Sequence, residues 1–220
     1  MSIQEAIKEI RKGNFILLHD SKEREDETDM VIAAEFVKPE HIAKMRQYAG
    51  GLICVAVSRE IAKKLSLPFM AEILKFSEKK FPFLKNVRAY DILYDEKSAF
   101  SIAINHRRTF TGISDNDRAL TISEFAKFCK NIGEMKNPKR EFGKIFRSPG
   151  HVPLLISSGI EKRQGHTELS IELLKKADVT PVAVICEILD SQSYKSLSVE
   201  KAKKFAKMNK IVFIEGSKIK

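Results

Sequence analysis

The 220-residue sequence predicts an α/β protein in which helices cover a β-sheet. Short apolar runs of strand length alternate with amphipathic segments of helical spacing along the whole chain, which is the pattern of a sheet with helices packed on it. No internal repeat, low-complexity tract or Gly/Ser-rich linker interrupts the alternation. A chain of this length can bury one sizeable core, so we expect a single domain over residues 1–220.

In the first half of the chain, expected strands are apolar runs at 15–19, 30–34 and 52–57. Expected helices carry apolar residues three or four positions apart, and they cover 3–10, a segment from Pro39 to Gly50, and a segment capped by Ser58. From 68 to 95, Phe and Pro alternate with lysines, and we interpret this stretch as an insertion or a flap.

In the second half, expected strands lie at 99–104, 153–157, 182–189 and 211–215, and expected helices at 167–177 and 199–209. A further helix should begin near Ser114 and run to about Asn131. Ser114 with Asp117, like Thr121 with Glu124, has the spacing of a capping box.

Composition indicates a cytoplasmic protein. No apolar run approaches the ~20 residues of a membrane span, and the charged N-terminus is unlike a secretion signal. Cys54 and Cys186 lie in apolar strands and Cys129 on a helix, so all three are expected as reduced core thiols. The net charge of +10 is spread over scattered lysines, which favours solubility and a mild attraction for anions.

The segment 20–29, between the first two strands, is strongly acidic. After Arg24 it carries the carboxylates of Glu25, Asp26, Glu27 and Asp29. Carboxylates crowded this closely repel one another unless a cation or a hydroxyl-rich ligand uses their potential, and oxygen ligands on a loop suit a hard divalent ion. The alternative is a solvated hairpin tip.

The segment 163–168 has the features of a phosphate site. Thr167 can cap the helix that follows, and a helix N-terminus offers backbone N–H groups and a positive dipole to anions. Arg163 adds a planar charged fork, and Gly165 lacks the side chain that would keep a ligand away. An ordinary capped helix beside a surface arginine is the alternative.

Two further residues are candidates for chemistry. His151 ends a polar loop immediately before an apolar strand, where a structural histidine is the commoner interpretation. Glu187 lies in an otherwise apolar strand, where an ionised carboxylate is costly unless it is paired or near a metal. Strand alternation could instead turn Glu187 towards solvent.

Five motifs then occur in order: REDETD at 24–29, TGISDNDRALTI at 111–122, RSPGHV at 147–152, RQGHTE at 163–168 and VAVICE at 182–187. Together they resemble those of 3,4-dihydroxy-2-butanone 4-phosphate synthases, over roughly residues 1–215. The resemblance implies a lyase of riboflavin biosynthesis, which converts D-ribulose 5-phosphate to L-3,4-dihydroxy-2-butanone 4-phosphate and formate through a metal-stabilised enediolate and a skeletal rearrangement. It also implies a three-layer fold with a mixed, twisted sheet and helices on both faces, and a homodimer that needs magnesium or manganese.

The resemblance also implies residue roles. Glu25 and His166 would bind the metal, and His151 and Glu187 would transfer protons. The substrate would contact the residues that line these motifs: Arg24, Glu25, Glu27, Asp29, Arg163, Gln164, Gly165, His166, Thr167 and Glu187. Because His151 lies apart from the other motifs, the neighbouring chain could donate it to a shared active site. The chain has no room for the GTP cyclohydrolase II domain that bacterial relatives often carry.

Several positions depart from the family pattern. Asp26 and Thr28 stand where many relatives have asparagine and glycine, Asp115 replaces a common alanine, and Ser148 adds a residue before Pro149. These departures leave the candidate catalytic atoms in place and alter the loop geometry.

A metal-dependent sugar-phosphate isomerase or aldolase would use the same kinds of residue. A basic RNA-binding module would explain the charge but not the acidic segment, which would repel phosphates.

Overall fold

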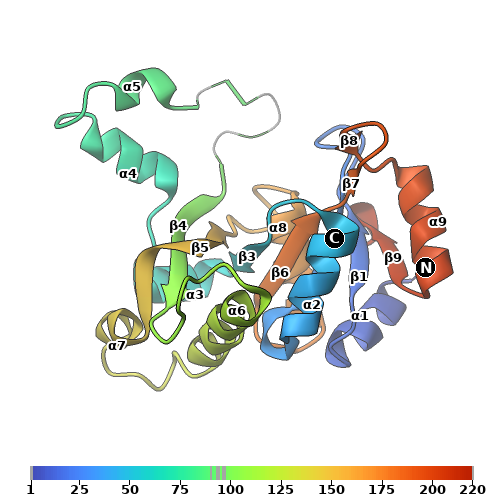
Figure 1. The fold of residues 1–220 in the computed structure, drawn as a ribbon, viewed down its shortest axis with the longest axis horizontal. Coiled ribbons are helices and arrows are strands. Elements are labelled where there is room, and N and C mark those ends of the chain that lie inside the picture. Colours follow the sequence, from blue (N-terminus) through green and yellow to red (C-terminus); the bar gives the residue numbers. More distant parts are fainter. Residues whose placement is uncertain (1, 90, 93–94, 96–97, 220) are drawn as a thin grey trace.

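The computed structural model describes residues 2–89, 91–92, 95 and 98–219, and its centre is a seven-stranded sheet (Figure 1). The strand order is β4-β5-β3-β6-β2-β1-β9. The strands are β1 Ile16–His19, β2 Thr28–Ala33, β3 Cys54–Val57, β4 Phe100–His106, β5 Phe146–Ile156, β6 Val182–Glu187 and β9 Val212–Glu215. The β1–β9 and β3–β5 pairs are parallel and the other four pairs are antiparallel, so the sheet is mixed.

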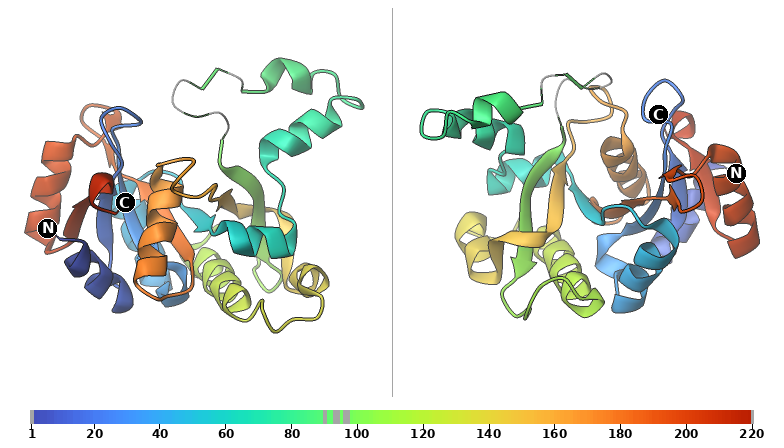
Figure 2. Two further views of the ribbon diagram at one scale, coloured as in Figure 1. Left: turned by 180° about the vertical axis from the view of Figure 1, so that it is seen from behind. Right: turned by 45° about the horizontal axis from the view of Figure 1, so that its top comes forward.

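Helices cover both faces of the sheet, which gives the three-layer fold that the sequence led us to expect. One face carries α1 Ile3–Arg11 and α8 His166–Lys176. The other carries α2 Pro39–Lys44 with its π-helical continuation Met45–Ala49, α3 Arg59–Leu65, α6 Asp115–Lys130, α7 Pro138–Ile145 and α9 Val199–Asn209. Figure 2 shows α8 in front of the sheet in the view from behind, whereas α2 and α6 lie in front in Figure 1.

Strand alternation divides the core into two apolar layers. Along β6, Val184 and Cys186 pack into the layer under α2 and α6, whereas Ala183 and Ile185 pack into the layer under α1 and α8. Both faces of the central strands are therefore covered, which explains why these strands read as continuous apolar runs. The same alternation decides on which face a polar residue at the end of a strand must lie.

The described part of segment 68–95 forms an arm that leaves the body of the molecule. It contains α4 Met70–Ser77 and α5 Leu84–Val87, and neither helix has a buried residue. Figures 1 and 2 show both helices projecting beyond the end of β4. An insertion was expected here, although positions 90, 93 and 94 lie outside the described residues.

Three expectations about local structure were wrong. The polar run 147–151 is not a loop before the strand but part of β5, which already begins at Phe146. Thr167 does not cap α8: the N-cap is Gly165, and it makes no side-chain capping hydrogen bond. Thr121 lies inside α6, where its hydroxyl donates to the Asp117 carbonyl and accepts from the His106 N–H, so Ser114 alone provides the cap.

The sequence analysis did not anticipate α7, nor the short β7 Leu189–Asp190 and β8 Lys195–Ser196 pair that follows β6. Among the helices that the structure describes, none combines the length and apolar character needed to cross a membrane.

Candidate functional site

Asp20 organises the loop of the β1–β2 hairpin. Its side chain is completely buried, and its carboxylate accepts hydrogen bonds from the backbone N–H groups of Glu25 and Glu27, each at 3.1 Å. The Arg24 guanidinium donates a third, also at 3.1 Å. A buried carboxylate with three donors holds the loop in one conformation. The acidic segment is therefore ordered around its own first residue and is not merely a solvated tip.

Asp29 and Glu187 face each other where β2 begins and β6 ends. They are register partners in this antiparallel pair, and alternation places both side chains on the face covered by α8. Asp29 is 1% exposed, and its Oδ1 is a buried atom without a hydrogen-bond partner. Glu187 is half-buried and accepts a 2.8 Å hydrogen bond from the Leu52 N–H. Glu187 is therefore hydrogen-bonded to the backbone, as expected for a paired carboxylate, and is only partly exposed to solvent.

His166 is the first residue of α8, and it closes the cluster from the opposite side. Its Nδ1 lies 3.3 Å from Glu25 Oε2, and its Nε2 lies 3.2 Å from the Glu27 carbonyl oxygen. Nε2 is also 3.7 Å from Asp29 Oδ1. The imidazole is 5% exposed, so these carboxylates surround it at low dielectric.

Burial and charge oppose each other in the pKa values of this cluster. Burial lowers the pKa of His166, but the nearby Asp29 charge and the Glu25 hydrogen bond outweigh it and raise the pKa to about 9. Burial raises the pKa of Glu25, and His166 and Arg24 overcome that effect and lower it to about 2. For Asp29, burial dominates and raises the pKa to about 7. Such strong and divergent shifts are typical of functional sites.

Two arginines lie beside this cluster and share one carboxylate. Asp95 Oδ2 accepts from Arg24 Nη2 at 2.6 Å and from Arg163 Nε at 2.8 Å. Arg163 Nη1 also donates to buried Glu168 at 2.5 Å. A Cβ at Gly165 would lie 2.6 Å from Arg163 Nη1 and 2.7 Å from Arg24 Nη2, so the absence of a side chain lets both guanidinium groups approach α8.

The other residues of the two motifs have different environments. Thr167 is buried beside the cluster, and Gln164 is exposed. The Glu27 side chain accepts a hydrogen bond from Ser196 Oγ of β8, while the Glu27 backbone contacts both Asp20 and His166. A cavity of about 150 Å³ lies between these elements, and its walls include Glu25, Asp29, Arg163, His166, Thr167 and Glu187.

His151 lies on β5, does not line this cavity and contacts none of the clustered side chains described above. The register of β4 and β5 jumps from the Ile104–Val152 pair to the Asn105–Arg147 pair, so His151 belongs to an irregular part of β5. Asn105 holds it there: the His151 N–H donates to Asn105 Oδ1 at 2.8 Å, and the two side chains meet at 3.1 Å. His151 is exposed, on the strand that neighbours the edge strand β4.

Asp20, Glu25 and His166 form a group suited to a metal ion. One ligand atom from each lies within 4.8 Å of the other two. Two carboxylates and one imidazole match the oxygen-rich donor sets of hard divalent cations, with nitrogen tolerated best by manganese among them. Glu25 and His166 were identified from the sequence, whereas Asp20 was missed. The available signal was its position directly after β1, where an Asp side chain can bind backbone N–H groups of the turn that follows.

Two charged residues at the site were also not anticipated. Glu168 belongs to the 163–168 motif, and its five-residue separation from Arg163 could have suggested their ion pair. Nothing in the sequence marks Asp95, because it lies in the irregular stretch before β4 and reaches the arginines only through the tertiary fold.

The fold and the site define a mixed α/β protein with a polar, enzyme-like centre where β2 and β6 meet the N-terminus of α8. The model of the 3,4-dihydroxy-2-butanone 4-phosphate synthase family matches residues 4–220. The chain belongs to that family.

Curated relatives of the same name agree with this identification. The synthase of Methanothermobacter thermautotrophicus is 49% identical over 219 residues, covering 99% of this chain and 93% of the relative. That of Archaeoglobus fulgidus is 43% identical, covering 100% and 92%. A solved synthase structure described as a complex with two magnesium ions has a TM-score of 0.78 at 27% identity, covering 100% of this chain and 94% of that one. The Candida albicans synthase structure gives 0.73 at 27% identity, covering 100% and 95%.

Proposed function

We propose that this chain is a lyase that converts D-ribulose 5-phosphate to L-3,4-dihydroxy-2-butanone 4-phosphate and formate, a step of riboflavin biosynthesis. The observation that carries the proposal is the cluster of Glu25, Asp29 and His166 beside two arginines in a chain of this family. The cluster combines acidic and basic groups with strongly shifted pKa values, as proton abstraction next to a ketone requires. Residues 1–220 work as one domain.

Glu25 and His166, with Asp20 beside them, would hold a divalent ion, magnesium or manganese. Two observations support a divalent ion here. The grouped side chains offer two carboxylates and one imidazole, and Asp29 Oδ1 nearby is a buried oxygen that lacks a hydrogen-bond partner in the described structure. Such an ion, when bound, stabilises negative charge that develops on substrate oxygens. Asp20 keeps its structural role as well, because its three hydrogen bonds fix the position of Glu25.

The phosphate of the substrate would bind near Arg163, Gly165 and Thr167. Support comes from Asp95, because Arg24 and Arg163 both donate hydrogen bonds to its Oδ2. The two guanidinium groups can therefore bind an anionic oxygen between them. Gly165 leaves the first turn of α8 open to a ligand, and N–H groups of a first helical turn lack intrahelical partners. A phosphate in this position would take the place of Asp95. The exposed Gln164 would border the same site.

The substrate hydroxyls would contact Arg24, Glu27 and Asp29, and protons would move between the substrate and the side chains of His151 and Glu187. Glu187 faces Asp29 across the β2–β6 pair and lines the cavity. Asp29, whose pKa is raised to about 7 by burial, can exist in either protonation state near neutral pH and is suited to hold a proton beside Glu187.

His151 would complete the site from a second copy of the chain. Within one chain it lies on β5 and does not line the cavity, and its exposed side chain would enter the site of a partner in a symmetric homodimer. The active unit is then a homodimer with two shared sites. The three buried free thiols, Cys54, Cys129 and Cys186, favour the reducing cytoplasm.

The decisive experiment incubates the chain with D-ribulose 5-phosphate and magnesium and follows formate. We expect one formate for each ribulose 5-phosphate consumed and no turnover after chelation. Glu25→Gln and His166→Ala should abolish formate release while the protein still unfolds cooperatively on heating. Consumption of substrate without formate would instead indicate an isomerase or an aldolase, and activity that survives chelation would remove the metal from the proposal.

A further inference from the structure

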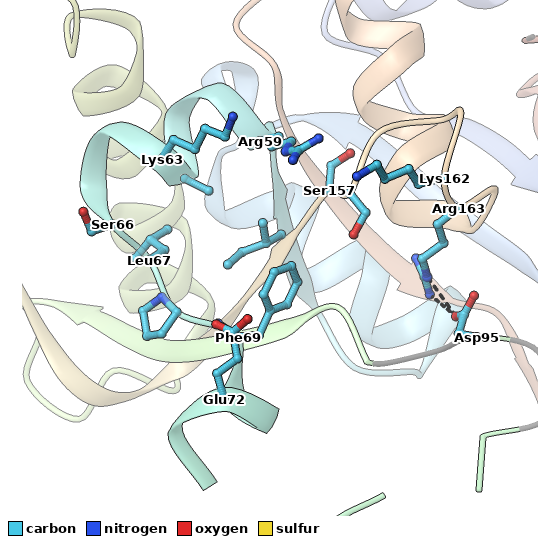
Figure 3. A pocket seen from close by; sticks show the side chains of 14 residues that line it. Arg59, Lys63, Ser66, Leu67, Phe69, Glu72, Asp95, Ser157, Lys162 and Arg163 are labelled. Atoms are coloured by element: carbon cyan, nitrogen blue, oxygen red, sulfur yellow. Dashed lines mark hydrogen bonds and ion pairs between the residues drawn. The ribbon is translucent and has the colours of Figure 1, made fainter. Parts of the chain in front are cut away.

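A second, larger pocket lies on the outer side of Arg163. Its volume is about 870 Å³, compared with about 150 Å³ for the cavity beside His166. Helix α3, the chain that leads into α4 and the segment after β5 form its walls (Figure 3). Among the described residues to which the lyase reaction has been attributed, only Arg163 lines this pocket, and Arg163 and Asp95 line both spaces.

Three further cations surround the pocket: Arg59 and Lys63 from α3 and Lys162 from the segment before α8. Figure 3 shows the Arg59 and Lys162 side chains converging near Ser157, with Lys63 on the same rim. In the part of the chain that the structure describes, none of these three forms an ion pair with a carboxylate. Grouped cations around a concave surface focus a positive potential into it.

The acidic residues at the pocket do not cancel this charge. Asp95 is bound by Arg24 and Arg163 on the side of the lyase site. The Glu72 carboxylate accepts the Phe69 N–H at 3.2 Å, at the edge away from the cations. Arg59, Lys63 and Lys162 therefore leave the pocket positively charged.

The remaining wall is apolar. Leu67 and Phe69 line it together with Ala62 and Ile156, and Figure 3 shows the Phe69 ring and Leu67 facing the space below Arg59. A pentose phosphate carries hydroxyl groups and would gain little from such a wall. An apolar or aromatic body with a phosphate group satisfies both parts of the pocket, because ring stacking and cation contacts are then available together.

From these features we infer that this pocket is a second ligand site, separate from the lyase site, for a phosphomonoester that carries an aromatic ring system. The phosphate lies among Arg59, Lys63 and Lys162, and the ring lies against Leu67 and Phe69. The volume exceeds what a five-carbon substrate fills, and ordinary ligand pockets of 300–1,000 Å³ include this size. The inference goes beyond the proposed lyase reaction and does not depend on it.

Binding is tested by calorimetric titration of the whole chain with flavin mononucleotide, with AMP and with inorganic phosphate, all without ribulose 5-phosphate. We expect saturable binding of at least one of the two aromatic phosphates, and the stronger of the two identifies the ring system. Inorganic phosphate should bind much more weakly. Lys63→Glu and Arg59→Glu should each weaken binding about tenfold or more, the effect of losing a hydrogen bond to a charged group.

Lys64→Glu is the matched control, because it makes the same charge change on the neighbouring residue of α3, whose Nζ lies near Gly133 and outside the pocket. It should leave binding within about twofold of the parent. Formate release by Lys63→Glu should also equal that of the parent. The inference is overturned if neither aromatic phosphate saturates the parent, if inorganic phosphate binds as tightly, or if Lys64→Glu weakens binding as much as Lys63→Glu. Because no turnover is involved in the titration, none of these outcomes bears on the lyase assignment.

Discussion

His166 is the residue whose protonation links the stability of the chain to metal binding. Asp29 and Glu25 hold its imidazole in the charged form and raise its pKa to about 9, against a value of 6.5 for the free side chain. A divalent ion needs the neutral imidazole, so an ion that enters near His166 must release this proton. At neutral pH the carboxylates of Glu25 and Asp29 therefore stabilise one positive charge beside them. That charge is either the His166 imidazolium or a bound metal ion.

The raised pKa predicts how the stability of the metal-free chain depends on pH. Below pH 6.5 both the folded and the unfolded chain carry the His166 proton, so the stabilisation is complete. As pH rises through about 9, the folded chain loses that proton and the stabilisation disappears. We expect the free energy of unfolding, measured by urea denaturation with chelator, to fall between pH 7 and 9.

The matched variant for this prediction is His166→Gln, which has no ionisable group at this position. Its stability should change much less between pH 7 and 9 than that of the parent. Most of the contribution of Asp29, whose own pKa is raised to about 7, is lost as pH rises towards 7, so above pH 7 His166 is the larger contributor to the slope. Equal slopes for the parent and His166→Gln would show that the imidazole is not held in its charged form.

We expect Gly165→Ala to weaken substrate binding without a large loss of stability. Its φ of −86° suits any residue, so Gly165→Ala introduces no backbone strain. The new methyl group would lie 2.7 Å from the Arg24 guanidinium carbon and 2.6 Å from Arg163 Nη1, so both flexible ends must shift. We expect KM for ribulose 5-phosphate to rise about tenfold or more, in line with the loss of a charged hydrogen bond.

Gly143→Ala is the control, since a Cβ there meets no atom within 4 Å. In helix α7 this change should leave KM unchanged and raise the free energy of unfolding by up to about 1 kcal/mol. An unaltered KM for Gly165→Ala would show that the positions of Arg24 and Arg163 do not matter for the substrate.

Local motifs predicted Glu25 and His166 as candidate site residues, whereas residues that reach the candidate site only through tertiary contacts were not predicted. The juxtaposition of Glu25 and His166 followed from family motifs, and the structure brings their side chains together. Asp95 carried no signal because its partners Arg24 and Arg163 are distant in sequence. Thr167 was expected as the cap because threonine is a good capping residue, but the N-cap lies two residues earlier, at Gly165, and the helix begins at His166.

At the scale of elements, the β1–β2 hairpin depends on Asp20. The Asp20 carboxylate binds two backbone N–H groups and Arg24 in a fully buried position. Asp20→Ala should lower the free energy of unfolding by about 1–3 kcal/mol, because these donors lose their buried acceptor. Formate release should also be lost, since Glu25 is no longer held beside His166. Urea denaturation and the formate assay measure the two effects.

Glu23→Ala provides the comparison within the same loop, because Glu23 is exposed and makes no hydrogen bond or ion pair among the described residues. It should change the free energy of unfolding by less than about 0.5 kcal/mol. If Asp20→Ala is as stable as Glu23→Ala, the loop is ordered by other contacts.

Most strands and helices could be predicted because their apolar spacing matches the face they bury. Helix α7 escaped because it has no fully buried residue, although Phe142 packs against Phe146. The extension of β5 through 147–151 escaped because polar and Pro/Gly-rich sequence is typical of loops, and only the pairing with β4 makes it a strand.

At the scale of the molecule, the order of strands creates the site. β6 lies between β3 and β2, so Glu187 from late in the chain meets Asp29 from its start, and the Leu52 N–H contacts Glu187 from the other side. Such pairings between distant segments are not encoded in local spacing. They explain why the class of fold could be predicted from local patterns whereas the order of the strands could not.

The position of His151 leads to a prediction about the assembled molecule. β5 holds the exposed His151 beside the edge strand β4, where Asn105 fixes its backbone, and His151 does not line the cavity beside His166. In a two-fold dimer each chain would give one His151 and receive one.

His151→Ala and Glu25→Gln should each be inactive alone. After subunit exchange a mixed dimer contains one site with both defects and one intact site, so mixing should restore formate release, up to half of the mixed dimers' sites. Exchange is verified by native mass spectrometry with one chain isotopically labelled. If mixed dimers form and no formate appears, His151 acts within its own chain and must move to reach the cavity.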